Sequence, residues 1–262
     1  MVCVKFSIFF LCIPTMIKLV WLLSQRIRNR LTSGCILGLW LTTSTVALAE
    51  YQPPPDQKPP SGYSQSTGSR GGCEVNTDTS LTTLAPHNHI GRTASRHPTF
   101  AWFVPNSKPY PLEFTLYKFI PSGNIQPIYK TQLKSAPGIM KLSLPQSHPG
   151  LNFGQRYIWQ VAILCDPNYP SKDLVASSEI EVVKMLRSQE LEIDRVGDRC
   201  AKISLLARLG LWYDYLAEAA SASDGGLSKV AAMLELAKQE ESATQVNNSR
   251  SINLRQIAIS SQ

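Results

Sequence analysis

The apolar positions of residues 157–165, Tyr-Ile-Trp-Gln-Val-Ala-Ile-Leu-Cys, form a long run rich in residues that favour β-strands. Side chains alternate between the two faces of a strand, and both faces of this run are mainly apolar. One face carries Tyr157, Trp159, Val161, Ile163 and Cys165, and the other carries Ile158, Gln160, Ala162 and Leu164. The pattern predicts the central strand of a β-sheet, covered on both sides.

A corner motif precedes this strand. Leu151, Gly154, Tyr157 and Trp159 stand in the spacing Leu-x-x-Gly-x-x-Tyr-x-Trp. In immunoglobulin-like sandwiches, a tyrosine at such a corner hydrogen-bonds through its hydroxyl to the backbone a few residues upstream. We therefore expect an immunoglobulin-like or fibronectin-like β-sandwich, with the Tyr157 hydroxyl bonded back to the corner.

Short apolar runs separated by turn residues continue this pattern over residues 73–186, at the spacing of an all-β sandwich. They predict seven strands, near residues 81–85, 99–104, 112–119, 127–131, 139–144, 157–165 and 178–184. Apolar Leu112 and Phe114 alternate with polar Glu113 and Thr115, which indicates that this strand buries one face.

The hydrophobic period changes to that of α-helices over residues 187–241. Apolar residues recur at helical spacing up to Gly210, which we expect to end a helix in the left-handed conformation. Further helices are predicted over residues 211–222 and 227–241, so a small helical hairpin or three-helix unit should follow the sandwich. We expect this unit to pack on the sandwich, with Trp212 buried.

The first 49 residues have the pattern of a secretory signal peptide. Arginines precede an apolar run, and small residues at Ala47 and Ala49 suit cleavage before Glu50. Met16 is an alternative start of translation. If the segment is not cleaved, it is expected to anchor the chain to a membrane, and the rest of the chain is exported in either case.

Both flanks of the folded part are expected to be unstructured. Residues 50–72 are rich in proline, serine and glycine and are interpreted as a linker, whereas the polar residues 242–262 are predicted to form a disordered tail. The net charge of +7 depends on the leader: removing its five basic residues from 26 leaves 21 against 19 acidic ones, a balance of +2. This balance argues against nucleic acid as a partner, because such binding needs many positive charges.

Three cysteines lie beyond the leader: Cys73, Cys165 and Cys200. Cys165 ends the predicted central strand and Cys73 enters the sandwich, so a bond between these two is our first choice in an oxidising compartment. Cys200 lies on the apolar face of a predicted helix, where we expect a buried thiol outside any disulfide.

Few residues suggest catalysis or metal binding. His87 and His89 flank one residue in a loop and are weak candidates for a metal site, with His97 or His148 as further ligands. No motif of a zinc site, a hydrolase nucleophile or a phosphate-binding loop accompanies them. We therefore assign no catalytic residue and no cofactor.

Aromatic residues offer a different kind of candidate site. Residues 99–104 place Phe103 on the face opposite Phe100 and Trp102, and residues 211–215 spread three aromatics around little more than one helical turn. Because these cannot share one buried stripe, Phe103, Tyr213 and Tyr215 are candidates for a partner-binding surface. The alternative is that most of them form the contact between the helices and the sandwich.

Several motifs, taken in order, resemble the domain-of-unknown-function family 928. They are Arg70-Gly-Gly-Cys73, Leu81-Thr-x-Leu84-x-Pro86, His97-Pro-Thr-Phe100-x-Trp102, Tyr157-x-Trp159, Cys165-Asp-Pro167 and Gly210-x-Trp212-Tyr-Asp214. The resemblance extends from Arg70 to about Leu236. It implies a secreted or periplasmic protein, typically cyanobacterial, without an established activity, and it supports the pairing of Cys73 with Cys165.

Together these features predict an exported, non-enzymatic binding or scaffolding module of the cell envelope, in the periplasm or outside the cell. Its partner is expected to be another envelope protein. Two alternatives stay open. One is a hydrolase or carbohydrate-active enzyme with a site in the loops around His87 and Asp166, and the other is a metal-binding envelope protein that uses His87 and His89.

Overall fold

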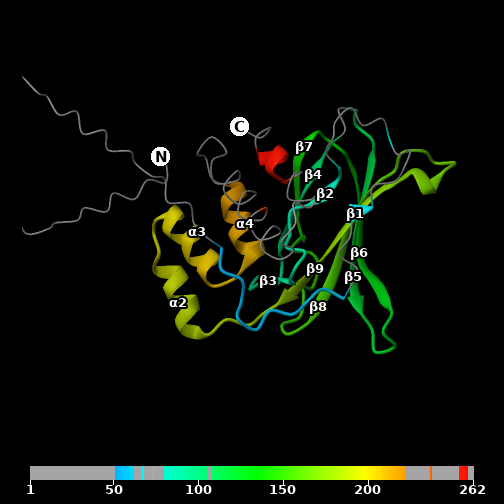
Figure 1. Ribbon diagram of the computed structural model, residues 1–262. Helices are drawn as coiled ribbons and strands as arrows, with labels where there is room; N and C mark the ends of the chain where they lie inside the picture. Colours follow the sequence, from blue (N-terminus) through cyan, green and yellow to red (C-terminus); the bar gives the residue numbers. More distant parts are fainter. Residues whose placement is uncertain are drawn as a thin grey trace, which may run out of the picture. The chain divides into compact units, whose positions relative to one another are not determined.

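The computed structural model describes residues 51–61, 66–67, 73, 80–105, 108–221, 237 and 254–258, and everything below refers to these residues (Figure 1). The predicted signal peptide and nearly all of the predicted helix over residues 227–241 lie outside them. No helix in this part of the chain is both long and apolar enough to cross a membrane.

Six strands form the larger sheet, in the order β1-β9-β8-β5-β6, with β3 also paired to β9. Their bounds are β1 Ser66–Thr67, β3 Gly91–Thr93, β5 Pro111–Phe119, β6 Ile125–Lys134, β8 Arg156–Ile163 and β9 Leu174–Val182. All neighbours are antiparallel except β3 and β9, which are parallel. The predicted central strand is confirmed as β8, which lies between β5 and β9.

A second, antiparallel sheet has the order β2-β4-β7. Its strands are β2 Thr82–Thr83, β4 Thr99–Val104 and β7 Gly138–Ser143. Each of the seven predicted strands coincides with one of the observed strands. The short strands β1 and β3 were not predicted, because two or three residues show no hydrophobic period.

The two sheets face each other across an aromatic core. The ring centroid of Phe100 on β4 lies 5.0 Å from that of Phe114 on β5 and 5.3 Å from that of Trp159 on β8. Trp102 on β4 also stacks on Phe114. These side chains are fully buried. On β5, half-buried Glu113 fits the predicted one-sided burial, but Thr115 is buried as well, so this prediction is confirmed only in part.

The predicted corner before β8 is also present. The Tyr157 hydroxyl accepts a hydrogen bond of 3.0 Å from the backbone N–H of Asn152. This bond fixes the turn through which the chain enters the central strand.

Three α-helices follow the sheets: α2 Arg187–Arg195, α3 Arg199–Arg208 and α4 Trp212–Ser221; a short 3-10 helix, η1 Pro170–Lys172, precedes β9. The helix is interrupted between α2 and α3. There the Asp198 carboxylate accepts a hydrogen bond from the N–H of Ala201 and caps the N-terminus of α3. Gly210 follows α3 with a φ of +68°, which confirms it as the left-handed end of that helix.

Helix α4 packs on β3 and β4, so the helices contact the sandwich as predicted. Trp212 is fully buried, and its indole N–H donates to the Leu84 carbonyl at 2.9 Å. The predicted fold class, a β-rich protein with C-terminal helices, is thus confirmed, and its strands form two sheets.

Two segments predicted to be unstructured are not. Residues 51–61, interpreted as a linker, run from the helices toward β1 along the lower edge of the view (Figure 1). Tyr51 is only 2% exposed. In the predicted disordered tail, residues 254–258 are helical, and Leu254 and Ile257 are buried in the core. Both segments bury a few apolar side chains, although their overall composition is polar or rich in proline and therefore predicted no burial.

Candidate functional site

The Cys73–Cys165 disulfide is confirmed. Its Cα atoms are 4.9 Å apart, and the bond closes a sequence separation of 92 residues between the N-terminal segment and the end of β8. The expectation for Cys200 is wrong: it is half-buried at the start of α3 and takes part in a disulfide.

The histidines considered as metal ligands do not converge. The His89 ring is bonded through Nδ1 to Asn88 at 2.6 Å and through Nε2 to the Tyr51 hydroxyl at 3.1 Å. His87 lies 3.4 Å from the Thr83 hydroxyl, and His97 contacts the loop carbonyl of His148. Within the described residues, no three His, Cys, Asp or Glu side chains gather closely enough to hold a metal ion.

The aromatic residues proposed as a partner surface are buried. Tyr213 and Tyr215 are each 1% exposed, and Phe103 is 8% exposed on β4. The expectation that Tyr213 or Tyr215 faces solvent is therefore wrong. A single buried stripe does not describe α4, because the sandwich covers one of its sides and residues near Tyr51 cover another.

Tyr213 joins α4 to the larger sheet. Its hydroxyl donates to the Glu179 carbonyl at 2.9 Å and accepts from the indole N–H of Trp159 at 2.8 Å. Burial raises the pKa of this phenol well above its ordinary value. Gly91 on β3 is required here, because a Cβ on it would lie 2.8 Å from the Tyr213 ring.

Tyr51 anchors residues 51–61, which we call the N-terminal strap. Its ring packs edge-on against Trp212, with centroids 5.0 Å apart, and lies beside the rings of His89 and Tyr215. The next residue, Gln52, donates its N–H to the carbonyl of Ala207 on α3 at 3.1 Å. The strap is therefore part of the core.

Charged residues hold the rest of the strap to the outer face of β9. Arg92 forms a bidentate ion pair with Asp56 at 2.8 Å and a second ion pair with Glu181. Lys58 also contacts Glu181, at 2.6 Å. Burial alone would raise the pKa of Glu181, but the hydrogen bonds from Lys58 and Arg92 hold it below its ordinary value. These charges secure one edge of the larger sheet.

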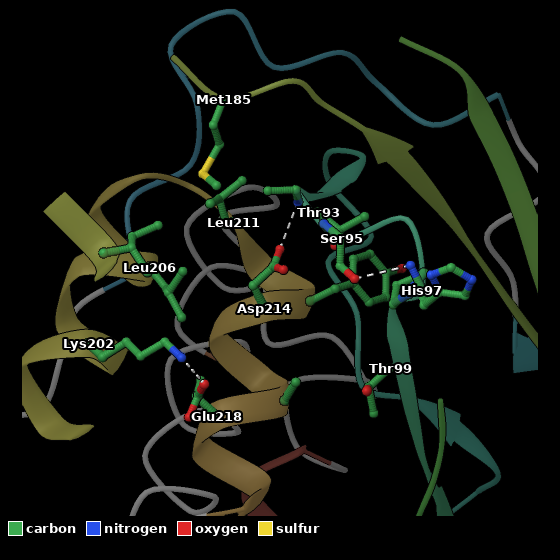
Figure 2. Close-up of a pocket in the computed structure, with 15 residues that line it drawn as sticks. Thr93, Ser95, His97, Thr99, Met185, Lys202, Leu206, Leu211, Asp214 and Glu218 are labelled. Atoms are coloured by element: carbon green, nitrogen blue, oxygen red, sulfur yellow. Dashed lines mark hydrogen bonds and ion pairs between the residues drawn. The ribbon is translucent and has the colours of Figure 1, made fainter. Parts of the chain in front are cut away.

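A cavity of about 250 Å³ lies where the loop between β3 and β4 meets the three helices. Met185, Ile193, Leu206 and Leu211 form an apolar wall, and polar residues of the loop and of α4 form the other side. Figure 2 shows Asp214 and Glu218 on α4 and Lys202 on α3 around this space.

Asp214 is the most unusual polar group in the cavity. Its carboxylate accepts the backbone N–H of Ala94 at 2.9 Å and a hydrogen bond from the Thr93 side chain. Burial nevertheless raises its pKa above the ordinary value for aspartate. Glu218, by contrast, pairs with Lys202, and Arg199 lies 3.8 Å from its other oxygen.

The cavity does not contain a catalytic relay, although Ser95, His97 and Asp214 all line it. The Ser95 hydroxyl accepts the backbone N–H of His97 at 3.1 Å (Figure 2). The imidazole itself donates through Nε2 to the His148 carbonyl at 2.9 Å, and Asp214 bonds the loop backbone. A hydrolase of the Ser-His-Asp type would need these three side chains bonded to one another.

The other proposed loop site is no closer to a catalytic arrangement. Asp166 accepts from the N–H of Asn168 and lies 3.4 Å from the Lys172 ammonium. His87 contacts Thr83 instead. Sequence reasoning missed both the strap and the cavity; the only local signals were the lone Tyr51 beside the prolines and the Asp214–Glu218 spacing of four on one helix face.

Comparison with known families places these features in a wider group. The family described as Domain of Unknown Function (DUF928) matches residues 65–247, and the chain belongs to this family. None of the curated proteins compared with the chain matches it significantly.

Proposed function

We propose that this member of the DUF928 family is an exported, non-enzymatic binding module of the cell envelope. It is built on an immunoglobulin-like or fibronectin-like sandwich, and its partner site lies along the open edge of β6. The observation that carries the proposal is that β6, the last strand of the larger sheet, pairs with β5 alone among the described strands.

Three features support the proposed type of sandwich. The tyrosine corner at Tyr157 opens the central strand. Consecutive strands cross between the sheets, from β4 to β5, from β6 to β7 and from β7 to β8. A tryptophan is buried between the sheets at Trp159. Immunoglobulin-like domains combine a tyrosine corner, strands that cross between the sheets and a buried tryptophan, but their tryptophan lies on a different strand from the corner tyrosine.

Export is supported by the Cys73–Cys165 disulfide, since such bonds persist in oxidising compartments and are rare in the cytosol. The predicted signal peptide is consistent with this location. Periplasmic or extracellular export places the domain where envelope proteins are its potential partners.

Only half of the β6 edge is suited to strand addition. Pro127 has no backbone N–H to donate. His148 packs on the Tyr129 ring and hydrogen-bonds the backbone of Ile128. The usable part is therefore residues 130–134, beside a groove of about 370 Å³. Its lining residues are Pro109, Tyr110, Pro111, Gln132, Leu133 and Lys134.

The side chains of this stretch define the partner's chemistry. Thr131 and Leu133 stand opposite Phe114 and Leu112, on the face toward the core. Lys130 and Lys134 lie on the other face and are exposed; Lys130 pairs with Glu113 on β5 at 2.9 Å, so Lys134 is the main charge for a partner. An extended segment that alternates apolar and acidic residues fits both faces, with backbone hydrogen bonds to β6 supplying the common affinity.

Site-specific photo-crosslinking in cells tests this partner site. A photoreactive amino acid at exposed Gln132 should yield a discrete crosslinked envelope protein, and the same group at exposed Ser188 on α2 should not. Crosslinks of equal yield at both positions, or at Ser188 alone, would contradict the β6 site. Fractionation of the same cells tests export, which fails if the protein is found in the cytoplasm.

A further inference from the structure

The cavity beside α4 holds a carboxylate, Asp214, that forms no ion pair with any described residue. Two carboxylates, Asp214 and Glu218, line it together with one ammonium, Lys202. Lys202 and Arg199 are both engaged by Glu218. Within the described part of the chain, Asp214 takes part in no ion pair and accepts hydrogen bonds from Thr93 and Ala94; burial raises its pKa, and the charge of Lys202 partly opposes this rise.

A carboxylate withdrawn from water without a counter-ion is costly, and a cation brought close to it recovers part of that cost. The Ser95 and Thr99 hydroxyls also line the cavity; each has one partner, the His97 N–H and the Ser143 hydroxyl respectively, and each oxygen keeps a lone pair for an N–H donor. The polar side thus suits a small positive group with several donors, such as a primary ammonium.

The opposite wall has different chemistry. Met185, Ile193 and Leu206 present only apolar atoms. A volume of about 250 Å³ is slightly below the range of roughly 300–1,000 Å³ of sites for drug-sized ligands, so a smaller molecule is indicated. A short branched hydrocarbon chain would cover this wall while its charged end reaches Asp214.

We propose that the cavity binds a small primary amine with a branched apolar chain, its ammonium paired with Asp214 and its hydrocarbon part packed on Met185, Ile193 and Leu206. This site shares no residue with the β6 edge, so it is independent of the proposed partner site.

Binding of three matched probes to the full-length mature protein tests the proposal. The probes are 3-methylbutylammonium, the neutral 3-methylbutanol and the anionic 4-methylpentanoate, each titrated by ligand-observed NMR at neutral pH. The amine should bind roughly tenfold or more tightly than the alcohol, as expected for a hydrogen bond to a charged group. Equal binding of amine and alcohol, or tighter binding of the anion, would overturn the proposal.

Asp214→Asn removes the charge and keeps an oxygen that can accept from Ala94. In this variant the amine should lose roughly tenfold in affinity and bind like the alcohol, whose own affinity stays unchanged. Lys202→Met is the matched control, because it removes the competing cation and should leave amine binding equal or tighter. An Asp214→Asn protein that binds the amine as tightly as the parent refutes the role of Asp214.

A pH series on the parent protein keeps the test decisive if Asp214→Asn does not fold. Amine affinity should fall as acid protonates Asp214, whereas alcohol affinity should not. Glu218 on α4, Lys202 on α3 and His97 in the β3–β4 loop also face the cavity. Glu218→Gln therefore serves as a second control, and its amine binding should keep the same pH dependence. A flat profile for the parent contradicts the proposal.

Discussion

The two edges of the larger sheet differ in how far the chain covers them. At β9, the strands β1 and β3 divide the edge between them, and the strap lies on the adjoining outer face. At β6, one half of the edge is blocked by Pro127 and His148, and the other half is left without a neighbouring strand. An exposed edge is a hazard for aggregation, so chains that keep one usually protect it. The contrast is between an edge that the chain itself covers and an edge that we propose receives a partner.

Removing the disulfide should have the largest effect on the covered edge. The bond ties the end of β8 to the segment that follows β1, across a separation of 92 residues. Replacing Cys73 and Cys165 together by alanine should lower the free energy of unfolding by about 4 to 5 kcal/mol in the chain-entropy account. Urea unfolding measures this loss, and a difference below about 1 kcal/mol would show that the strap and strands hold this edge without the bond.

Tyr51→Ala should be nearly as damaging. The phenol ring fills a space between Trp212, Tyr215 and His89, and the loss of a fully buried aromatic side chain costs about 3 to 5 kcal/mol. Tyr129→Ala on β6 is the matched control, because that ring is only half-buried and should cost clearly less. Thermal unfolding of both variants tests the contrast, which is refuted if the two lose the same stability.

Acid should weaken the contact of the strap with the core, because His89 packs beside Tyr51. Burial, together with the charge of Arg92, lowers the pKa of His89 to about 4 in the folded protein, against 6.5 when unfolded. The unfolded chain therefore binds the extra proton first. The contribution of neutral His89 to the free energy of unfolding is fully present above pH 6.5. It is lost as the pH falls toward 4, by roughly 3 kcal/mol at most.

The histidine effect is measured as a difference between two proteins. Urea unfolding of the parent and of His89→Gln should give curves of stability against pH that converge between pH 6.5 and 4. Carboxylates such as Glu181 and Asp214 titrate in both proteins and cancel in the difference. Curves that stay parallel would show that another group governs the acid response.

The smallest effect on stability is expected at the open edge. Lys134→Glu changes an exposed side chain and should alter the free energy of unfolding by less than about 0.5 kcal/mol. It should nevertheless reduce the photo-crosslink from Gln132, because the proposed partner strand carries acidic residues. Lys184→Glu, also exposed, is the control and should leave the crosslink intact.

Local patterns were sufficient to predict the sandwich strands and the end of α3. Alternation in residues 112–115, the corner at Tyr157 and the helix stop at Gly210 each depend on a few neighbouring residues. The Cys73–Cys165 bond could be inferred from the places of the two cysteines at the start of the predicted sandwich and the end of its central strand, whereas the bond of Cys200 could not. These features need no knowledge of which distant segments meet.

The strap and the cavity depend on distant contacts, and the sequence showed neither. Proline-rich composition indicates a linker because few side chains can be buried, yet one residue, Tyr51, is enough to anchor the segment in the core. Its ring also explains why Tyr215 is covered. The cavity forms only when the β3–β4 loop meets α4, so the spacing of Asp214 and Glu218 could not reveal it.

The unequal edges of the larger sheet also limit its stoichiometry. A sheet with two open edges can be extended indefinitely, each newcomer offering a fresh edge to the next. Here the β9 edge is already taken by the chain's own β1 and β3, which have only two and three residues, so β6 is the one long edge strand of this sheet among the described residues. If two copies paired through β6, the larger sheet of the pair would end in β1 and β3 on each side, and these short strands would offer few backbone groups for further growth.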